Sequence, residues 1–162
     1  MHCLNLGIEE DQTQNVLWRI ENGELDNIKP KVVVLSVGFN NTHHTPEEVV
    51  EGLQACEAAI RKHQPHANVV VIELFPSGPQ PNPLRERVAM INQQLREASW
   101  GPITQVVNLD PGFVQADGTI SHHDMYDYQH LTRNATMRTF EPLADLLGQL
   151  LSEQQLNDAP SQ

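Results

Sequence analysis

The chain has 162 residues, 39% of them hydrophobic, which suits one globular domain with a single core. Its formal net charge is -11, so its electrostatic field repels both nucleic-acid backbones and anionic membranes. The start of the chain has no signal-peptide pattern, no apolar run is long enough to span a membrane, and only two cysteines occur, Cys3 and Cys56. We therefore expect a reduced, soluble, cytoplasmic protein with no nucleic-acid partner and no transmembrane segment.

Short apolar runs rich in β-branched residues alternate with amphipathic stretches, which predicts an α/β fold with a parallel sheet covered by helices. Four strands are predicted, at residues 2–7, 31–38, 68–75 and 103–109. A short helix is predicted at residues 13–22, with Trp18 as a packing anchor in the core or a lid.

Three longer helices follow. Thr45, Pro46 and Glu48 form a helix N-terminus with a capping box, and another helix follows the turn-rich SGPQPNP stretch. The last helix is predicted around residues 140–150, with Pro142 near its first turns, and a polar tail at residues 153–162 follows the domain of residues 1–152. Apolar residues repeat at helical spacing in all three helices: Val49, Leu53, Cys56 and Ile60; Leu84, Val88, Ile91 and Leu95; Phe140, Leu143, Leu147 and Leu150.

Sites in open α/β sheets form at the carboxyl ends of the strands. Three segments fall there: GIEED at residues 7–11, GFNN at 38–41, and the region after Leu109 that contains SHHDMYDYQHLT at 121–132. Because they follow separate strands of one sheet, we expect them to converge on one crevice.

Asp127 and His130 are three positions apart, a spacing at which a carboxylate reaches an imidazole on a helical turn or a tight loop. A carboxylate bound to Nδ1 fixes the tautomer and leaves Nε2 as a general base. The same spacing also occurs in loops where the two side chains only hydrogen-bond to each other. Such structural pairs are more frequent than catalytic ones, so the spacing alone favours a structural role.

Two further interpretations concern nearby polar residues. His122, His123 and Asp124, with His130, are ligand types that suit zinc or iron, but their spacing matches no helical two-histidine motif. Asn40 directly follows a strand and a glycine, where its side-chain N–H can donate to an oxyanion or, more commonly, form an Asx-turn.

Four stretches together resemble the catalytic alpha subunits of platelet-activating factor acetylhydrolase IB, and the last is most similar to the alpha-one, or gamma, type. They are DQTQNVLWRIENGEL, KPKVVVLSVGFNN, PNPLRER and DPGFVQADGTISHHDMYDYQHLT, and the likeness runs from about residue 4 to residue 151. This family belongs to the SGNH, or GDSL-type, hydrolases. The resemblance implies a flavodoxin-like three-layer sandwich and a Ser-His-Asp triad that removes the acetyl group of an ether phospholipid, without a metal or cofactor.

Carried over by position, the resemblance makes His130 the general base, Asp127 its orienting carboxylate and Asn40 an oxyanion-hole donor. The family's nucleophile lies in a G-D-S motif after a first strand, ahead of the segment that matches residues 2–7, and no G-D-S occurs in this chain. The first strand is therefore expected to be missing, which would leave unpaired sheet edges. We expect the 162 residues to be inactive for lack of the serine.

Three differences from the family fall at the site. Glu10 stands where the family has a glycine whose N–H lines the oxyanion hole, and it adds a Cβ where the backbone needs positive φ as well as a negative charge. Phe39 and Gln129 replace a Thr and a Leu beside the small acyl pocket. They are expected to change its volume and polarity.

The resemblance leaves two hypotheses open. The chain is a fragment or shortened gene model of a working acetylhydrolase subunit, or it is a non-catalytic relative kept for binding. The family's alpha subunits form homodimers and heterodimers and associate with a WD40-repeat lissencephaly protein that regulates dynein. The resemblance makes both partners expectations for this chain, and a metal-dependent hydrolase is the third hypothesis.

Overall fold

The computed structural model describes residues 2–157. Eight elements follow one another along the chain: α1 (Thr13–Arg19), a π-helical turn η1 (Ile20–Glu24), β1 (Val32–Leu35), α2 (Pro46–His63), β2 (Asn68–Ile72), α3 (Pro83–Glu97), β3 (Thr104–Val107) and α4 (Arg133–Asn157). Helices and strands alternate from β1 onward, as the sequence predicts for an α/β fold.

The strands form one parallel sheet in the order β1-β2-β3. Val32 is paired with Asn68 at the start of β1, and Val69 of β2 is paired with Thr104 of β3. Parallel pairing requires a crossover between neighbouring strands, and α2 and α3 provide the two crossovers. The carboxyl ends of all three strands therefore lie at the same edge of the sheet.

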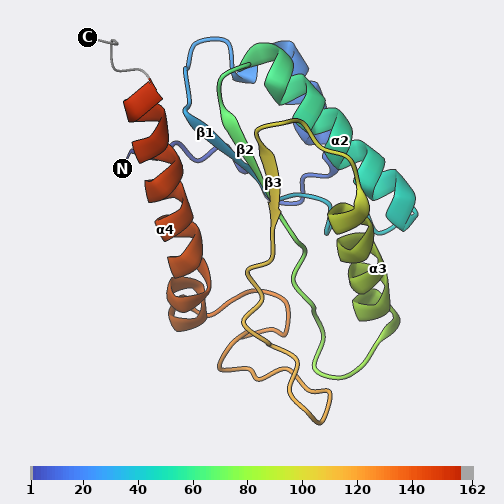
Figure 1. Ribbon diagram of the computed structural model, residues 1–162. Coiled ribbons are helices and arrows are strands. Elements are labelled where there is room, and N and C mark those ends of the chain that lie inside the picture. The colour runs from blue at the N-terminus through green and yellow to red at the C-terminus, as the bar shows by residue number, and fades with distance from the viewer. Residues whose placement is uncertain (1, 158–162) are drawn as a thin grey trace.

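The sheet is covered on both faces, with α4 on one side and α2 and α3 on the other (Figure 1). β2 is buried on both faces because its side chains alternate between two cores. Val69 and Val71 contact the larger core beneath α2 and α3, whereas Val70 and Ile72 contact the core beneath α4. The predicted three-layer α/β architecture is confirmed.

The predicted apolar stripes form these cores. Leu53, Cys56 and Leu95 have no exposed surface. The α2 N-terminus is also as predicted: Thr45 Oγ1 accepts from the Glu48 N–H at 3.2 Å, and the Glu48 carboxylate accepts from the Thr45 N–H at 2.7 Å. Each bond satisfies an amide that the first turn leaves without a helical acceptor.

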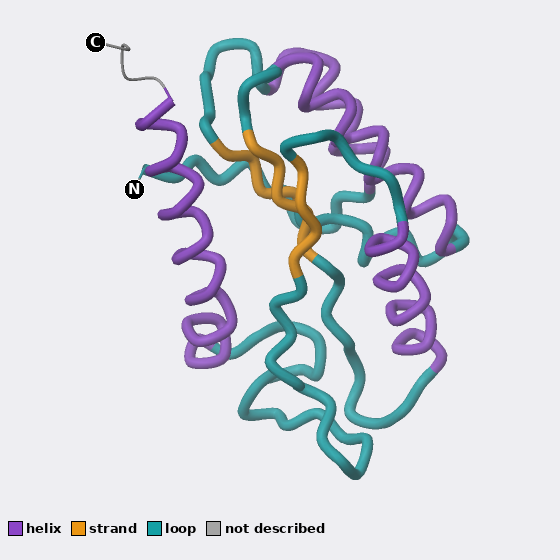
Figure 2. The backbone as a smooth tube through the Cα atoms, viewed as in Figure 1, coloured by secondary structure: helices purple, strands orange, loops and turns teal. Residues whose placement is uncertain are grey.

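The strand predicted at residues 2–7 is wrong. That segment has no regular structure, and Figure 2 shows it as loop. Leu4 is 65% exposed, while Leu6 is partly buried against the larger core and its carbonyl accepts from Arg19 at 2.9 Å. A strand needs a neighbour to satisfy its N–H and C=O groups. No strand among residues 2–157 pairs with this segment or with the outer edge of β1. The short apolar run was therefore not sufficient to form a strand.

The other predicted strands are real but shorter than predicted, and the last helix begins earlier than predicted. α4 starts at Arg133 because the Thr132 hydroxyl caps it, accepting from the Ala135 N–H at 3.3 Å. Pro142 consequently lies inside the helix, where it is exposed and solvent can satisfy the carbonyl that its ring leaves unpaired. α4 continues to Asn157, so the first residues of the predicted polar tail are helical. The remainder of that tail lies outside the described residues.

The first helix also differs from its prediction. α1 ends at Arg19 and continues into η1, where Gly23 adopts a φ of 99° and interrupts the helical geometry. Trp18 is 64% exposed, so its predicted role as a packing anchor is wrong, whereas Trp100 is partly buried against the larger core. None of the helices among residues 2–157 is both long and apolar enough to cross a membrane.

Candidate active site

Two long loops occupy the edge of the sheet where the strands end (Figure 2). One joins β2 to α3, and the other joins β3 to α4 and includes the residues 121–132 that the sequence singled out. A small third core lies under the second loop and consists of buried Phe113, Ile120, Met125 and Ala135, with Phe75 and Leu131 packed against it. Buried apolar anchors therefore hold this loop, although most of its polar side chains are exposed.

Asp127 and His130 contact each other in this loop through both main chain and side chain. Oδ2 of Asp127 lies 2.6 Å from Nδ1 of His130, and Oδ1 accepts from the His130 backbone N–H at 2.7 Å. The Gln129 N–H donates to the same Oδ1 at 3.0 Å. The carboxylate thus fixes the local turn and the imidazole together.

These bonds favour the ionised carboxylate. The pKa of Asp127 is lowered from 3.8 to about 2, mainly by the backbone N–H of His130, then by its side chain and by the N–H of Gln129. An ionised carboxylate can only accept hydrogen bonds, so Nδ1 of His130 must be the donor. Nε2 of the neutral ring is then left as the proton acceptor.

The imidazole faces solvent rather than the protein interior. The side chain of His130 is 59% exposed and that of Asp127 is 42% exposed. The Tyr126 ring stacks on the imidazole, with ring centroids 6.0 Å apart, and the Tyr126 N–H donates to the His130 carbonyl at 3.1 Å. The ring is therefore held on the Asp127 side and along one face, while Nε2 stays accessible to a reacting group.

Tyr128, between the two residues, has a φ of 64°, in the left-handed region that non-glycine residues rarely adopt. Its carbonyl accepts from the Gly78 N–H at 2.6 Å, which attaches the turn to the β2–α3 loop. Gly78 has a φ of 90°, and a Cβ there would lie 2.3 Å from Nδ2 of Asn82. A glycine is therefore required at position 78, where the two loops are joined by this hydrogen bond.

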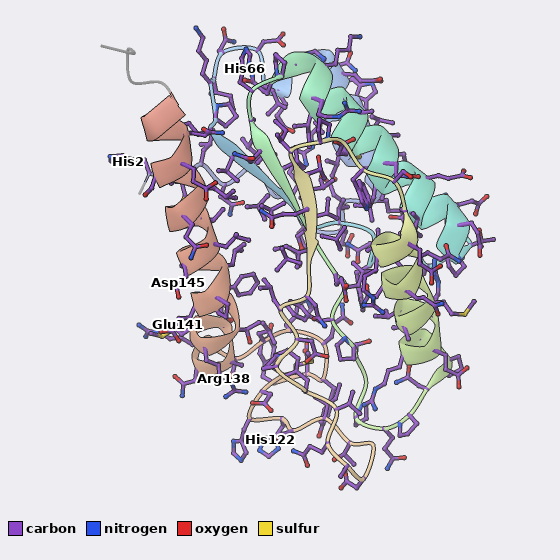
Figure 3. The ribbon with its side chains drawn as sticks, viewed as in Figure 1. His2, His66, His122, Arg138, Glu141 and Asp145 are labelled. Carbon is purple, nitrogen blue, oxygen red and sulfur yellow. The ribbon has the colours of Figure 1, made fainter. Side chains whose placement is uncertain are left out.

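The nearby histidines His122 and His123 contact each other in the structure. Their ring centroids lie 4.1 Å apart, and Asp124 is paired with Arg138 at the start of α4. Figure 3 shows His122 in the loop cluster near the foot of α4, where Arg138 lies. Within residues 2–157 no group of three or more His, Cys, Asp or Glu is arranged to hold a metal ion. Among the described residues, His122, His123, Asp124 and His130 are therefore not brought together as the ligand set that the metal alternative needs.

Asn40 lies after β1, against the segment that precedes α1. Its side-chain Nδ2 donates to the Asp11 backbone carbonyl at 3.2 Å, and its backbone carbonyl accepts from Nε2 of Gln12 at 3.1 Å. One of the two amide hydrogens is used in this way, which leaves the other for a ligand. Hydrogen bonds among the described residues bring Asn40 to Asp11 and Gln12, and none joins it to His130.

Glu10 belongs to the same segment and has a φ of 64°. The glycine that the family has at this position anticipates a positive φ. The Cβ of Glu10 makes this conformation strained. Its side chain is exposed. The two residues predicted to line an acyl pocket lie in different surroundings. Phe39 packs against the larger core, whereas Gln129 is exposed in the loop that carries Asp127 and His130.

The described serines have other roles. Ser77 is buried, and its carbonyl accepts from Nδ2 of Asn82 at 2.9 Å. The hydroxyl of Ser121 accepts from the His123 N–H, and that of Ser152 donates to a carbonyl of its own helix. None of the serines in residues 2–157 is hydrogen-bonded to His130, so the structure brings Asp127 and His130 together without a serine hydroxyl bonded to the imidazole.

Sequence reasoning missed several residues that fix segments at this end of the molecule. Asn41 is 1% exposed and binds the start of α1 through its side chain, accepting from the Thr13 N–H at 3.0 Å. Tyr126 and Arg85 were also not identified. The two adjacent asparagines were a usable signal for Asn41. Tyr126 contacts His130 within the same loop, whereas Arg85 joins two loops that are far apart in sequence, and no local pattern marks it.

Comparisons with known proteins identify the family of the chain. Residues 2–135 match the model of the GDSL-like lipase/acylhydrolase family. The human platelet-activating factor acetylhydrolase IB subunit alpha1 is 50% identical over 161 residues, covering 99% of this chain and 70% of the relative. The Drosophila melanogaster subunit beta homolog is 51% identical over 154 residues, covering 94% of this chain and 68% of the relative.

Solved structures show the same fold at low sequence identity. A carbohydrate esterase family 3 structure from Talaromyces cellulolyticus superposes with a TM-score of 0.69 at 17% identity, covering 89% of this chain and 70% of the other. The M. smegmatis aryl esterase superposes with a TM-score of 0.63 at 16% identity, covering 83% and 67%. With the family model and the 50% identical relatives, these findings show that the chain belongs to the GDSL-like lipase/acylhydrolase family and is a homologue of the platelet-activating factor acetylhydrolase IB alpha subunits.

Proposed function

We propose that the chain carries the base half of a serine-type acyl-transfer site, with His130 as general base, Asp127 as its orienter and Asn40 as an oxyanion donor. The observation that carries the proposal is the 2.6 Å contact between Oδ2 of Asp127 and Nδ1 of His130, together with the exposed imidazole. This is the arrangement that an imidazole needs to take a proton from an attacking hydroxyl at Nε2.

The steps balance as follows. A serine Oγ attacks the ester carbonyl carbon while its proton passes to Nε2 of His130, and the carbonyl oxygen becomes an oxyanion. The free amide hydrogen of Asn40 donates to that oxygen. When the tetrahedral intermediate collapses, the proton on Nε2 goes to the leaving alkoxide. A water molecule then repeats the sequence, and the acetyl group leaves as acetate.

The substrate class we propose is an acetyl ester, in particular that of an ether phospholipid. The proposal rests on the 50% identity to acetylhydrolase alpha1 subunits over 99% of this chain. Phe39 and Gln129 differ from the family at the acyl pocket. The accepted acyl group is therefore the property we expect to differ most from that of the relatives.

We propose that the serine is supplied from outside the described residues, because no serine within them is bonded to His130 and no G-D-S motif occurs in the chain. The 162-residue polypeptide alone is accordingly proposed not to turn over an ester. Glu10 adds a second obstacle, since it brings a carboxylate and a strained backbone to the segment bonded to Asn40. Loss of one oxyanion donor costs about 10² to 10³ in rate.

A chimera tests the proposal. The strand and G-D-S segment of the human alpha1 relative is fused in front of residue 2, and acetate release from an acetyl ester is measured. The chimera should release acetate and lose this activity with His130→Ala, whereas the 162-residue chain should be inactive. A folded chimera that stays inactive even with Glu10→Gly, Phe39→Thr and Gln129→Leu would reject a catalytic role.

A second candidate is a non-catalytic interaction subunit, and one observation favours it. The outer edge of β1 is unpaired among residues 2–157, and Val34 on this strand is 38% exposed. Such an edge can pair with another chain. The partners proposed are acetylhydrolase alpha subunits, in a homodimer or heterodimer, and the WD40-repeat lissencephaly protein. Copurification with tagged alpha subunits and the WD40 protein tests it, and absence of both from the eluate would reject it.

A further inference from the structure

We infer that Arg85 is a positioning residue for the Asp127–His130 dyad, acting through the two loops that its guanidinium joins. The inference rests on the proposed function, because it assigns Arg85 a role in holding the base of that site. Arg85 lies in the first turn of α3 and contacts neither dyad residue directly. Its effect passes through the main chain.

The guanidinium binds three backbone carbonyls from two different loops. Nε donates to the Ser77 carbonyl at 3.0 Å, one terminal nitrogen donates to the Gly78 carbonyl, and the other donates to the Gly118 carbonyl. Ser77 and Gly78 lie in the β2–α3 loop, whereas Gly118 lies in the β3–α4 loop about ten residues before the dyad. A planar group with fixed donor directions therefore sets the spacing between these loops.

The β2–α3 loop is also bonded to the turn that carries Asp127 and His130. The N–H of Gly78, whose carbonyl Arg85 holds, donates to the Tyr128 carbonyl at 2.6 Å, and the Ile120 N–H donates to the Pro79 carbonyl at 3.2 Å. Tyr128 lies between Asp127 and His130 with a φ of 64°. A backbone conformation of this kind persists only where its surroundings hold it. Arg85 binds the carbonyl of the Ser77–Gly78 peptide, and the N–H of this peptide is the group that bonds to Tyr128.

Several features of the contacts argue that positioning is the role of Arg85. Among residues 2–157, the hydrogen-bond partners of its guanidinium are all main-chain carbonyls, so the side chain fixes loops rather than forming an ion pair. Gly78 is required by its φ of 90° and by the close approach of Asn82. Arg85 and Gly78 thus form a rigid support beneath an exposed dyad that has little packing of its own.

Arg87 provides a matched control on the same helix. It lies two residues further along α3 and also donates to two main-chain carbonyls, those of Asn41 and His44. These carbonyls belong to the loop after β1, which is separate from the dyad loop. Arg87→Met therefore removes a similar number of contacts from the same helix without loosening the support of Tyr128.

The experiment is to read the tautomer of neutral His130 from its two ring ¹⁵N shifts in the 162-residue chain. The wild type should hold the proton on Nδ1, and Asp127→Ala should release this preference. Arg85→Met should give a mixture of tautomers, and exchange of the His130 amide should become on the order of tenfold faster. Arg87→Met should leave both measurements as in the wild type.

The outcomes separate the inference from the proposed function. If the wild type does not hold the proton on Nδ1, or if Asp127→Ala does not change the tautomer, the dyad itself is rejected. If Asp127→Ala acts but Arg85→Met leaves the tautomer and the exchange unchanged, only the Arg85 inference is overturned. Equal changes in Arg87→Met overturn it too, because the effect would then follow from general loss of stability.

Arg85→Lys decides the matter if Arg85→Met does not fold. One ammonium group keeps the charge but cannot reproduce the fork that reaches three carbonyls. The Lys variant should therefore fold, and its His130 amide should exchange faster than in the wild type while the amides of β2 do not. Exchange of the His130 amide at the wild-type rate in a folded Lys variant would overturn the inference.

Discussion

Asp127 binds His130 twice, through Oδ2 at 2.6 Å from Nδ1 of the ring and through Oδ1 at 2.7 Å from the backbone N–H. The carboxylate therefore orients the imidazole and closes the turn that carries it. Loss of the carboxylate charge is expected to affect both the site and the fold of the loop, and the first prediction uses this coupling.

The stability of the protein should decrease in acid partly through Asp127. Its pKa is lowered from 3.8 to about 2 in the folded protein, chiefly by the His130 N–H. Because the folded pKa lies below the unfolded one, this contribution is complete above about pH 4 and is lost as the pH falls toward about 2. Urea unfolding across this range should show a weaker pH dependence for Asp127→Asn. An identical dependence in the variant would contradict the prediction.

Glu10→Gly should be better tolerated than Glu9→Gly. Glu10 has a φ of 64°, where a Cβ costs about 1–2 kcal/mol. Glu9 is equally exposed but is not among the described residues with positive φ, so a glycine there only increases the unfolded-state entropy and costs about 0.4–1 kcal/mol. Chemical denaturation should show the Glu10 variant to be the more stable of the two. The reverse order would mean that the segment does not hold this backbone conformation.

Only one of the two cysteines should react with a thiol reagent in the native protein. Burial raises the pKa of the Cys56 thiol to about 12, so this thiol stays protonated and shielded near neutral pH. Cys3 is exposed. Colorimetric titration should count one thiol in the folded protein and two after denaturation, and Cys3→Ser should abolish the native signal. Rapid labelling of Cys56 would show that α2 is not packed as described.

Leu53→Ala should destabilise the protein far more than Leu4→Ala. Leu53 is fully buried on α2, where loss of a leucine side chain costs about 2–5 kcal/mol. Leu4 is 65% exposed and should change the free energy of unfolding by no more than about 0.5 kcal/mol. Urea denaturation compares them. A large loss at Leu4 would mean that residues 2–7 are packed as a strand after all.

Much of the fold follows from local patterns in the sequence. The capping box at Thr45 and the spacing of Val49, Leu53 and Cys56 predicted α2 because helix capping and helical periodicity depend on neighbours within a few residues. The hydrophobic runs predicted β1, β2 and β3 in the same way. The start of α4 was missed because Thr132 caps it eight residues before Phe140, where the predicted apolar stripe begins.

Local spacing was enough to predict the contact between Asp127 and His130, since three residues of separation keep a carboxylate within reach of an imidazole. It did not determine what holds them, because Arg85, Gly78 and Tyr128 come together only when two loops from different strands meet. The strand predicted at residues 2–7 was wrong for a related reason. A short apolar run can be recognised locally, but a strand forms only where a neighbour accepts its backbone hydrogen bonds, and that neighbour is a property of the tertiary structure.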